Sequence, residues 1–282
     1  EGVGAAIAAP FFLVLGGACD EHAAEGFLRA RTAGEQPPAR MSACRGPKGP
    51  LPAECSEYAV LPVAPPLAPT VSRPAFRIAI NGYGRIGRCY LRALHEAGLG
   101  ERFRVVAINE PADLASIAYL TRFDSTHGRF HGAVDCTEDA LIVGDQPIIV
   151  SHAHTPEEVD WEALGIDLLV ECSGQYGSRS ELARFLRAGC PRLLLSHPGN
   201  GAEDVDATVV FGVNHSQLDG REGLVSNASC TTNAVVPVLD LLHREIGIEQ
   251  ALLTTLHSAM NDQPLIDGYH HTDLRRTRSA MQ

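Results

Sequence analysis

Phe-Arg-Ile-Ala-Ile-Asn-Gly-Tyr-Gly-Arg-Ile-Gly-Arg, residues 76–88, is the stretch of the chain that decides its fold. Its first five residues form a short apolar run typical of a buried strand, and helical spacing of apolar residues begins at Arg85. Between the two lie Gly82, Gly84 and Gly87 in a G-x-G-x-x-G arrangement. A strand, a tight glycine turn and a helix in this order predict the first unit of a dinucleotide-binding sheet.

The three glycines have different tasks in such a turn. Gly82 permits the turn, Gly84 lets the backbone approach a pyrophosphate, and Gly87 allows close packing of helix on strand. Free N–H groups at the start of the helix favour an anion there. Glu110 follows the second expected strand, 23 residues beyond Gly87, where a carboxylate accepts ribose hydroxyls and repels a 2′-phosphate. The pattern therefore predicts an NAD site; the alternative for Glu110 is a solvated loop residue.

Outward from this stretch, strand-like and helix-like segments alternate along the chain. The expected strands are 76–80, 103–108, 168–170 and 193–195, the expected helices are 85–96, 114–123 and 181–188, and segments 141–143 and 148–150 form an expected hairpin. Alternation of this kind indicates a parallel sheet. We therefore expect an α/β fold over residues 75–225, a Rossmann-type, doubly wound parallel sheet that binds NAD.

The two flanks of this region differ from it. Residues 1–74 hold eleven of the 18 prolines and are expected to form a disordered extension. After about residue 226 a helix is expected from Cys230 towards Arg244, followed by a strand at Ala251–Leu256. We interpret residues 226–282 as the start of an α+β catalytic domain that the sequence leaves incomplete.

The composition excludes several classes of function. The net charge of −11 and the pI of about 5.5 argue against nucleic-acid binding. Lys48 is the only lysine, so no lysine Schiff base or Walker-type phosphate lysine is expected beyond it. Apolar runs stay shorter than the ~18 residues of a membrane span. Eight cysteines without a C-x-x-C spacing favour reduced thiols in the cytoplasm over a zinc ribbon or a disulfide framework.

One cysteine stands where a helix is expected to begin. Polar, cap-forming residues surround Cys230, and the N–H groups and dipole of a helix N-terminus lower the pKa of a thiol. His257 ends the strand expected after this helix, and a helix-then-strand hairpin brings that end back to the helix start. Cys230 and His257 are therefore the candidate nucleophile and base. The alternative for Cys230 is a small buried apolar residue, and His95 and His243 are expected in exposed helix turns.

Two motifs resemble the phosphorylating glyceraldehyde-3-phosphate dehydrogenase family. They are Ala-Ile-Asn-Gly-Tyr-Gly-Arg-Ile-Gly-Arg at 79–88 and Ser-Cys-Thr-Thr-Asn at 229–233, and the resemblance runs from about residue 75 to the end. Three further segments resemble the erythrose-4-phosphate dehydrogenase branch of the family: Asn109-Glu110-Pro111, His257-Ser258-Ala259-Met260, and Tyr269 through Arg278. Met260 stands where glycolytic members usually have a threonine that binds the substrate phosphate.

The resemblance implies roles for particular side chains in catalysis. Cys230 would be the nucleophile, and His257 would activate it and later handle protons. Ser229 and Thr231 would contact the substrate, a small phosphorylated aldehyde. Arg276 would contact the substrate phosphate.

The resemblance also implies the cofactor and the assembly. Arg85 and Ile86 would present backbone groups to NAD, while His154 stands where members often have an adenine-side arginine or lysine. His152 and His154 lie close in sequence but lack the further ligands of a metal site, so no metal is expected. The family's members are typically homotetramers. Their chains continue well beyond Gln282, so the sequence is expected to stop short of a natural C-terminus.

These implications define one expected reaction and two alternatives. The erythrose-4-phosphate branch implies NAD-dependent oxidation of erythrose 4-phosphate to 4-phosphoerythronate through a cysteine thioester, in pyridoxal-phosphate biosynthesis. The first alternative is the phosphorylating glyceraldehyde-3-phosphate dehydrogenase of glycolysis. The second is a chain that binds NAD but does not catalyse, because its catalytic domain is incomplete. Motif spacing does not choose between water and phosphate as the acceptor of the acyl group.

Overall fold

The computed structural model describes residues 75–257. Its strands are β1 (Phe76–Asn81), β2 (Phe103–Asn109), β3 (Phe123–Asp124), β4 (Gly128–Arg129), β5 (Val134–Cys136), β6 (Ala140–Val143), β7 (Gln146–Ser151), β8 (Leu168–Glu171), β9 (Leu193–Leu195), β10 (Ala207–Thr208) and β11 (Leu224–Ser226). Its α-helices are α3 (Arg85–Glu96), α4 (Leu114–Arg122), α5 (Arg179–Arg187) and α6 (Cys230–Ile246). Short 3-10 turns lie at Pro156–Glu158, Ala202–Asp204 and His215–Gln217.

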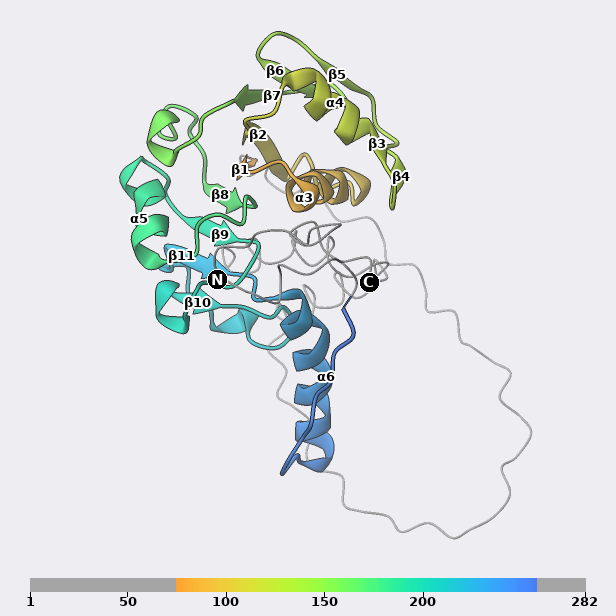
Figure 1. The fold of residues 1–282 in the computed structure, drawn as a ribbon, viewed down its shortest axis with the longest axis vertical. Helices are drawn as coiled ribbons and strands as arrows, with labels where there is room; N and C mark the ends of the chain where they lie inside the picture. The colour runs from red at the N-terminus through yellow and green to blue at the C-terminus, as the bar shows by residue number, and fades with distance from the viewer. Residues whose placement is uncertain (1–74, 258–282) are drawn as a thin grey trace, which may run out of the picture.

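Nine strands form the main sheet, in the order β10-β11-β9-β8-β1-β2-β7-β6-β5 (Figure 1). All neighbours from β10 to β7 pair in parallel. At the opposite edge β7, β6 and β5 pair antiparallel, which is the hairpin expected from the sequence. β3 and β4 form a separate two-stranded antiparallel sheet.

Helices cover both faces of the main sheet, and each face has its own core. On one face Ile80 of β1 belongs to the same buried cluster as Tyr90 of α3 and Ile117 of α4. On the other face Ala79 lies in a second cluster with Phe185 of α5. Successive residues of a strand point to opposite faces, so one apolar strand supplies both cores. The expected α/β fold with a Rossmann-type, doubly wound parallel sheet is confirmed.

The order of the strands reverses between β1 and β8. From β1 the chain crosses through α3 to β2 on one side, whereas β8 pairs with the other side of β1. The helices that follow the two strands, α3 and α5, pack in the cores of opposite faces of the sheet. In sheets of this kind ligands bind in a crevice at the carboxyl ends of two such strands, here β1 and β8.

Most expected elements lie where the sequence predicts them. α3 and β9 have the predicted bounds, while α5 begins at Arg179 because Ser178 and Glu181 form a capping box two residues earlier than expected. β5, β10 and β11 are short strands that the pattern did not indicate. The strand expected at Ala251–Leu256 is wrong. This segment is exposed and has no regular structure, because no described strand lies beside it to complete its hydrogen bonds.

Helix α6 projects away from the main sheet (Figure 1). It follows the last strand, β11, after a three-residue loop. Within the described part of the chain none of its residues is buried. Large apolar side chains are exposed along it and on the segment that follows, at Val238, Leu241, Leu242, Ile246, Leu252, Leu253 and Leu256.

Some expectations fall on parts of the chain outside the described residues. These are the extension at 1–74, Met260 and Arg276. The division into a domain over 75–225 and an incomplete one over 226–282 stays a prediction. None of the helices at 75–257 combines the length and the apolar composition needed to cross a membrane.

Candidate active site

The glycine turn after β1 is held tightly between helix α3 and the loop after β8. Gly82 has a φ of +82°, which favours glycine, and a Cβ there would come within 2.5 Å of Ser173 Cα. A Cβ on Gly87 would collide with the carbonyl oxygen of Gly82. Two of the three glycines are therefore required by the packing of the turn itself.

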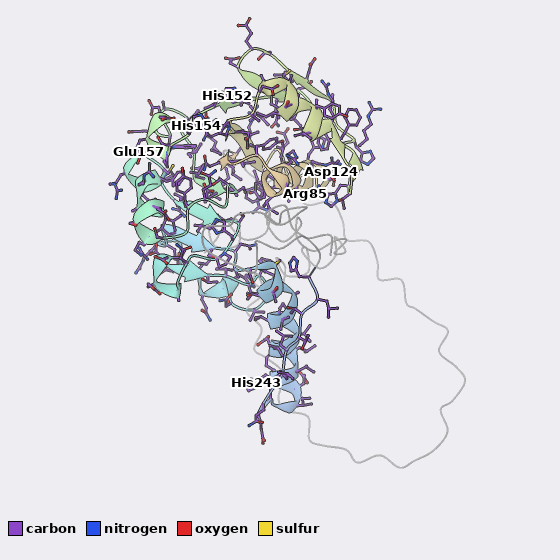
Figure 2. The ribbon with its side chains drawn as sticks, viewed as in Figure 1. Arg85, Asp124, His152, His154, Glu157 and His243 are labelled. Carbon is purple, nitrogen blue, oxygen red and sulfur yellow. The ribbon has the colours of Figure 1, made fainter. Side chains whose placement is uncertain are left out.

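The third glycine leaves space instead. Gly84 is exposed, precedes α3 as its N-cap, and would have no atom within 4 Å of an added Cβ. Among the described residues no side chain caps the start of α3, and its first turn contains no acidic residue. Arg85 turns its guanidinium to Asp124, 2.5 Å away, so the two side chains lie together (Figure 2). The backbone N–H groups of Arg85 and Ile86 stay available for a pyrophosphate, and the turn fits a dinucleotide.

Glu110 lies beside this turn, immediately after β2. Its Oε2 accepts a hydrogen bond of 2.7 Å from the backbone N–H of Tyr83, between the first two glycines. Its Oε1 accepts a longer one, of 3.3 Å, from Ala112 N. The carboxylate is half-buried at the carboxyl edge of the sheet, which is where a cofactor ribose would be bound.

A buried polar network crosses the same edge of the sheet, and sequence reasoning missed it. Ser151, Asn109, Asn81 and Glu171 are the last residues of β7, β2, β1 and β8, which are neighbours in the sheet. Hydrogen bonds of 2.5–2.9 Å join each side chain to the next. The signal was present in the sequence, because a polar residue follows the apolar run of each of these strands.

Cys230 is the first residue of α6, as the sequence predicts. Ser229 is the N-cap, and its side chain accepts a hydrogen bond from Thr232 N at 3.0 Å. The Ser229 hydroxyl also lies 2.7 Å from Thr232 Oγ1. The cap defines where the helix begins and leaves the thiol exposed at the N-terminal end of α6.

His257 lies beside this thiol. Its Nε2 is 3.1 Å from Cys230 Sγ, although 27 residues separate the two in sequence. Burial opposes ionisation, but the hydrogen bond and charge of His257, together with a hydrogen bond from Thr231, lower the pKa of Cys230. A lower pKa increases the share of thiolate at a given pH, and a thiolate can attack an electrophilic carbon.

The loop before Cys230 is fixed to the sheet and contains an uncommon backbone conformation. Ala228 has a φ of 57° and is the one described residue other than glycine with a positive φ. Its N–H donates to Ser226 Oγ at 3.0 Å, and Asn227 N donates to Leu195 O of β9 at 3.0 Å. Asn233 reaches back from α6 to the carbonyl oxygen of Asn227 at 2.7 Å. These contacts determine where the thiol lies relative to the sheet.

The other predicted site residues lie in different surroundings. Thr231 adjoins the thiol, as a substrate contact would. His154 is at the carboxyl side of β7, and His243 lies near the far end of α6, away from Cys230 (Figure 2). Within residues 75–257 no group of three or more His, Cys, Asp or Glu side chains is placed to hold a metal ion.

Comparison with protein families gives a match over each of the two stretches that contain these residues. Residues 76–179 match the model described as glyceraldehyde 3-phosphate dehydrogenase, NAD binding domain. Residues 229–282 match the model described as glyceraldehyde 3-phosphate dehydrogenase, C-terminal domain. NAD is the cofactor of the first of these, consistent with the open turn at Gly84. The two matches follow each other in the family's order and together cover more than half of the chain, which therefore belongs to the glyceraldehyde 3-phosphate dehydrogenase family.

Proposed function

We propose that the protein oxidises erythrose 4-phosphate to 4-phosphoerythronate, with NAD as the hydride acceptor and Cys230 as the nucleophile. The observation that carries the chemistry is the 3.1 Å contact between Cys230 Sγ and His257 Nε2 at the start of α6. The family match supports an aldehyde phosphate as the substrate class. The choice of the four-carbon sugar rests on the sequence segments around Glu110, Met260 and 269–278.

In the first stage the thiolate of Cys230 attacks the aldehyde carbon and forms a thiohemiacetal. His257 stabilises the thiolate as the imidazolium, gives its proton to the new alkoxide as the C–S bond forms, and takes that proton back as the hydride leaves. NAD, when bound, accepts the hydride that leaves the same carbon. The glycine turn and the start of α3 would hold its pyrophosphate, and Glu110 would accept hydrogen bonds from its ribose.

In the second stage the acyl group is bound to Cys230 as a thioester. Water attacks the thioester carbon, the C–S bond breaks, and the thiolate is restored with release of the carboxylate product. Once its first proton has passed to solvent, His257 is placed to take a proton from the attacking water, since its Nε2 lies next to the sulfur. Ser229 and Thr231 flank the thiol, and Thr231 would orient the substrate hydroxyls.

A second candidate is phosphate-dependent oxidation of glyceraldehyde 3-phosphate. The descriptions of both matched family models favour it. The nucleophile, the base and the cofactor would be the same, and inorganic phosphate would replace water as the attacking group. Met260, in place of the usual phosphate-binding threonine, is the reason for preferring the four-carbon substrate.

Steady-state assays of NADH formation distinguish the candidates. The purified protein would be given erythrose 4-phosphate or glyceraldehyde 3-phosphate, each with and without inorganic phosphate. We expect a higher kcat/KM for erythrose 4-phosphate and no requirement for phosphate. A phosphate-dependent preference for the three-carbon aldehyde would instead support the second candidate. NAD binding without turnover of either aldehyde would favour a chain that binds the cofactor and does not catalyse.

A further inference from the structure

The network of polar side chains at the carboxyl edge of the sheet converges on Glu171. This carboxylate is the last residue of β8 and is fully buried. Its Oε2 accepts from Asn81 Nδ2 at 2.5 Å, and its Oε1 accepts from Ser173 N at 2.7 Å and from the Ser173 hydroxyl. Ser173 Oγ in turn accepts from Gln175 N, so its own proton is directed to Glu171. In all three contacts the carboxylate accepts the hydrogen bond and the partner donates it.

The partners of Glu171 belong to the two loops that border the crevice. Asn81 immediately precedes Gly82, the first residue of the glycine turn. Ser173 lies in the loop after β8 and is the residue that Gly82 packs against. A backbone hydrogen bond of 2.7 Å from Cys172 N to Asn81 O joins the same two loops. One side chain thus connects both walls of the point at which the strand order reverses.

A buried carboxylate is costly unless donors satisfy it. Burial raises the pKa of Glu171, while the hydrogen bonds from Ser173 and Asn81 oppose that rise. A leucine or methionine could fill the same space in an apolar sheet without this cost. The chain instead has a carboxylate there, hydrogen-bonded to a residue of each loop.

We propose that Glu171 is a positioning residue of the dinucleotide site, which acts by holding the glycine turn and the loop after β8 at the separation that NAD requires. It would touch neither the cofactor nor the substrate. Asn81 transmits its effect to the turn, and Asn109 ties Asn81 to β2, beside Glu110. The inference uses the NAD site of the family and does not depend on which aldehyde is oxidised.

The test is the affinity for NAD of the Glu171→Gln variant, measured by calorimetry on the full chain below its unfolding transition. The amide has the shape of the carboxylate but presents an NH₂ group to one set of donors. We expect the Kd for NAD to rise about tenfold, as when a buried donor at a binding site loses its acceptor. Ser173→Ala removes one donor and should raise Kd by a smaller factor, and it tests the same contact if the first variant folds poorly.

Asp167→Asn is the matched control. Asp167 also joins β1 to β8, by accepting from Arg77 N at 2.7 Å, but at the amino ends of the strands and in an exposed position. Its Kd for NAD should equal that of the unsubstituted protein. A Glu171→Gln variant with unchanged Kd and a lower unfolding midpoint would show a role in stability alone, and would overturn the proposal.

A double variant tests the direction of the hydrogen bonds. In Asn81→Asp/Glu171→Gln the amide can donate to position 81 and still accept from Ser173, so donors and acceptors match again. Asn109 Nδ2 keeps an acceptor at position 81. We expect the double variant to regain most of the NAD affinity, and failure to do so would overturn the proposal. If the unsubstituted chain did not bind NAD, the cofactor site itself would be refuted, and this inference with it.

Discussion

Two alanine substitutions in the glycine turn should have opposite effects on stability and on NAD binding. Gly82 has a φ of +82°, and its Cβ position is occupied by the backbone of Ser173. Gly84 has a φ of −69°, and nothing lies within 4 Å of its Cβ position. Only Tyr83 separates the two residues, so the same substitution is compared at two positions of one loop.

The expected magnitudes follow from these differences. At Gly82 an alanine pays about 1–2 kcal/mol for the left-handed backbone. Displacing Ser173 adds about 1–3 kcal/mol of overpacking. The sum is a loss of roughly 2–5 kcal/mol, or a fall in Tm of roughly 5–15 °C for a domain of this size. At Gly84 an alanine in a permitted conformation should leave stability unchanged or raise it by about 0.4–1 kcal/mol.

Gly84→Ala should weaken the binding of NAD although it leaves stability unchanged or raises it. Its added methyl group would stand where the pyrophosphate approaches α3, so the Kd for NAD should rise by about tenfold or more. Thermal unfolding followed by circular dichroism, and calorimetric titration with NAD, measure the two quantities on each variant. The reasoning would be refuted by a Gly84→Ala variant that unfolds early and binds NAD normally, or by a Gly82→Ala variant as stable as the parent.

Other substitutions test the second half of the site and its supports. Cys230→Ser should abolish NADH formation and leave the Kd for NAD unchanged, as titration would show. His257→Asn should lower kcat by roughly 10²–10⁴-fold and move the alkylation of Cys230 to higher pH, because His257 lowers the pKa of the thiol; an unchanged alkylation profile would contradict the pairing. Burial raises the pKa of the Asp124 carboxyl group, but hydrogen bonds to it, including that from Arg85, lower the pKa by more. The pKa therefore falls from 3.8 to about 2. The ionised carboxyl group adds about 2 kcal/mol to the free energy of unfolding above pH ~4, and this contribution is lost towards pH 2. In Asp124→Asn the free energy of unfolding, measured by urea titration, should therefore vary less with pH across that window. Ala228→Val should cost at least about 2 kcal/mol and reduce kcat, since a β-branched residue resists a φ of 57°; full activity would contradict the role of this loop.

The sheet could be predicted because its signals are local. Apolar strands, helical spacing and the glycine turn at 82–87 each occupy a few consecutive residues, and the structure has them in that order. The sequence did not predict β10 and β11, because each has only two or three residues and pairs with strands that are distant in sequence. The strand expected at Ala251–Leu256 failed for the same reason in reverse. Its β-type pattern is local, but a strand also needs a hydrogen-bonded neighbour.

The candidate site divides along similar lines. Cys230 could be placed at a helix start from its cap residues, and His257 could be paired with it from the return of the chain. The predicted reason was partly wrong, since an irregular segment rather than a strand brings His257 back. The contact from Glu110 to Tyr83, and the convergence on Glu171, depend on the register of strands up to 90 residues apart. No local pattern contains that register.

Helix α6 is attached to the sheet at one end, as a cantilever is. Asn233 and the loop at 226–229 clamp its first turn, whereas Val238 and Ile246 further along are 56% and 78% exposed. Amide hydrogen exchange should therefore be slowest at the clamped turn and faster towards Ile246. The contacts with the sheet determine where the sulfur of Cys230 lies. The direction of the α6 axis depends on contacts along its later turns. A small rotation of α6 about its first turn would move Ile246 much further than the thiol of Cys230.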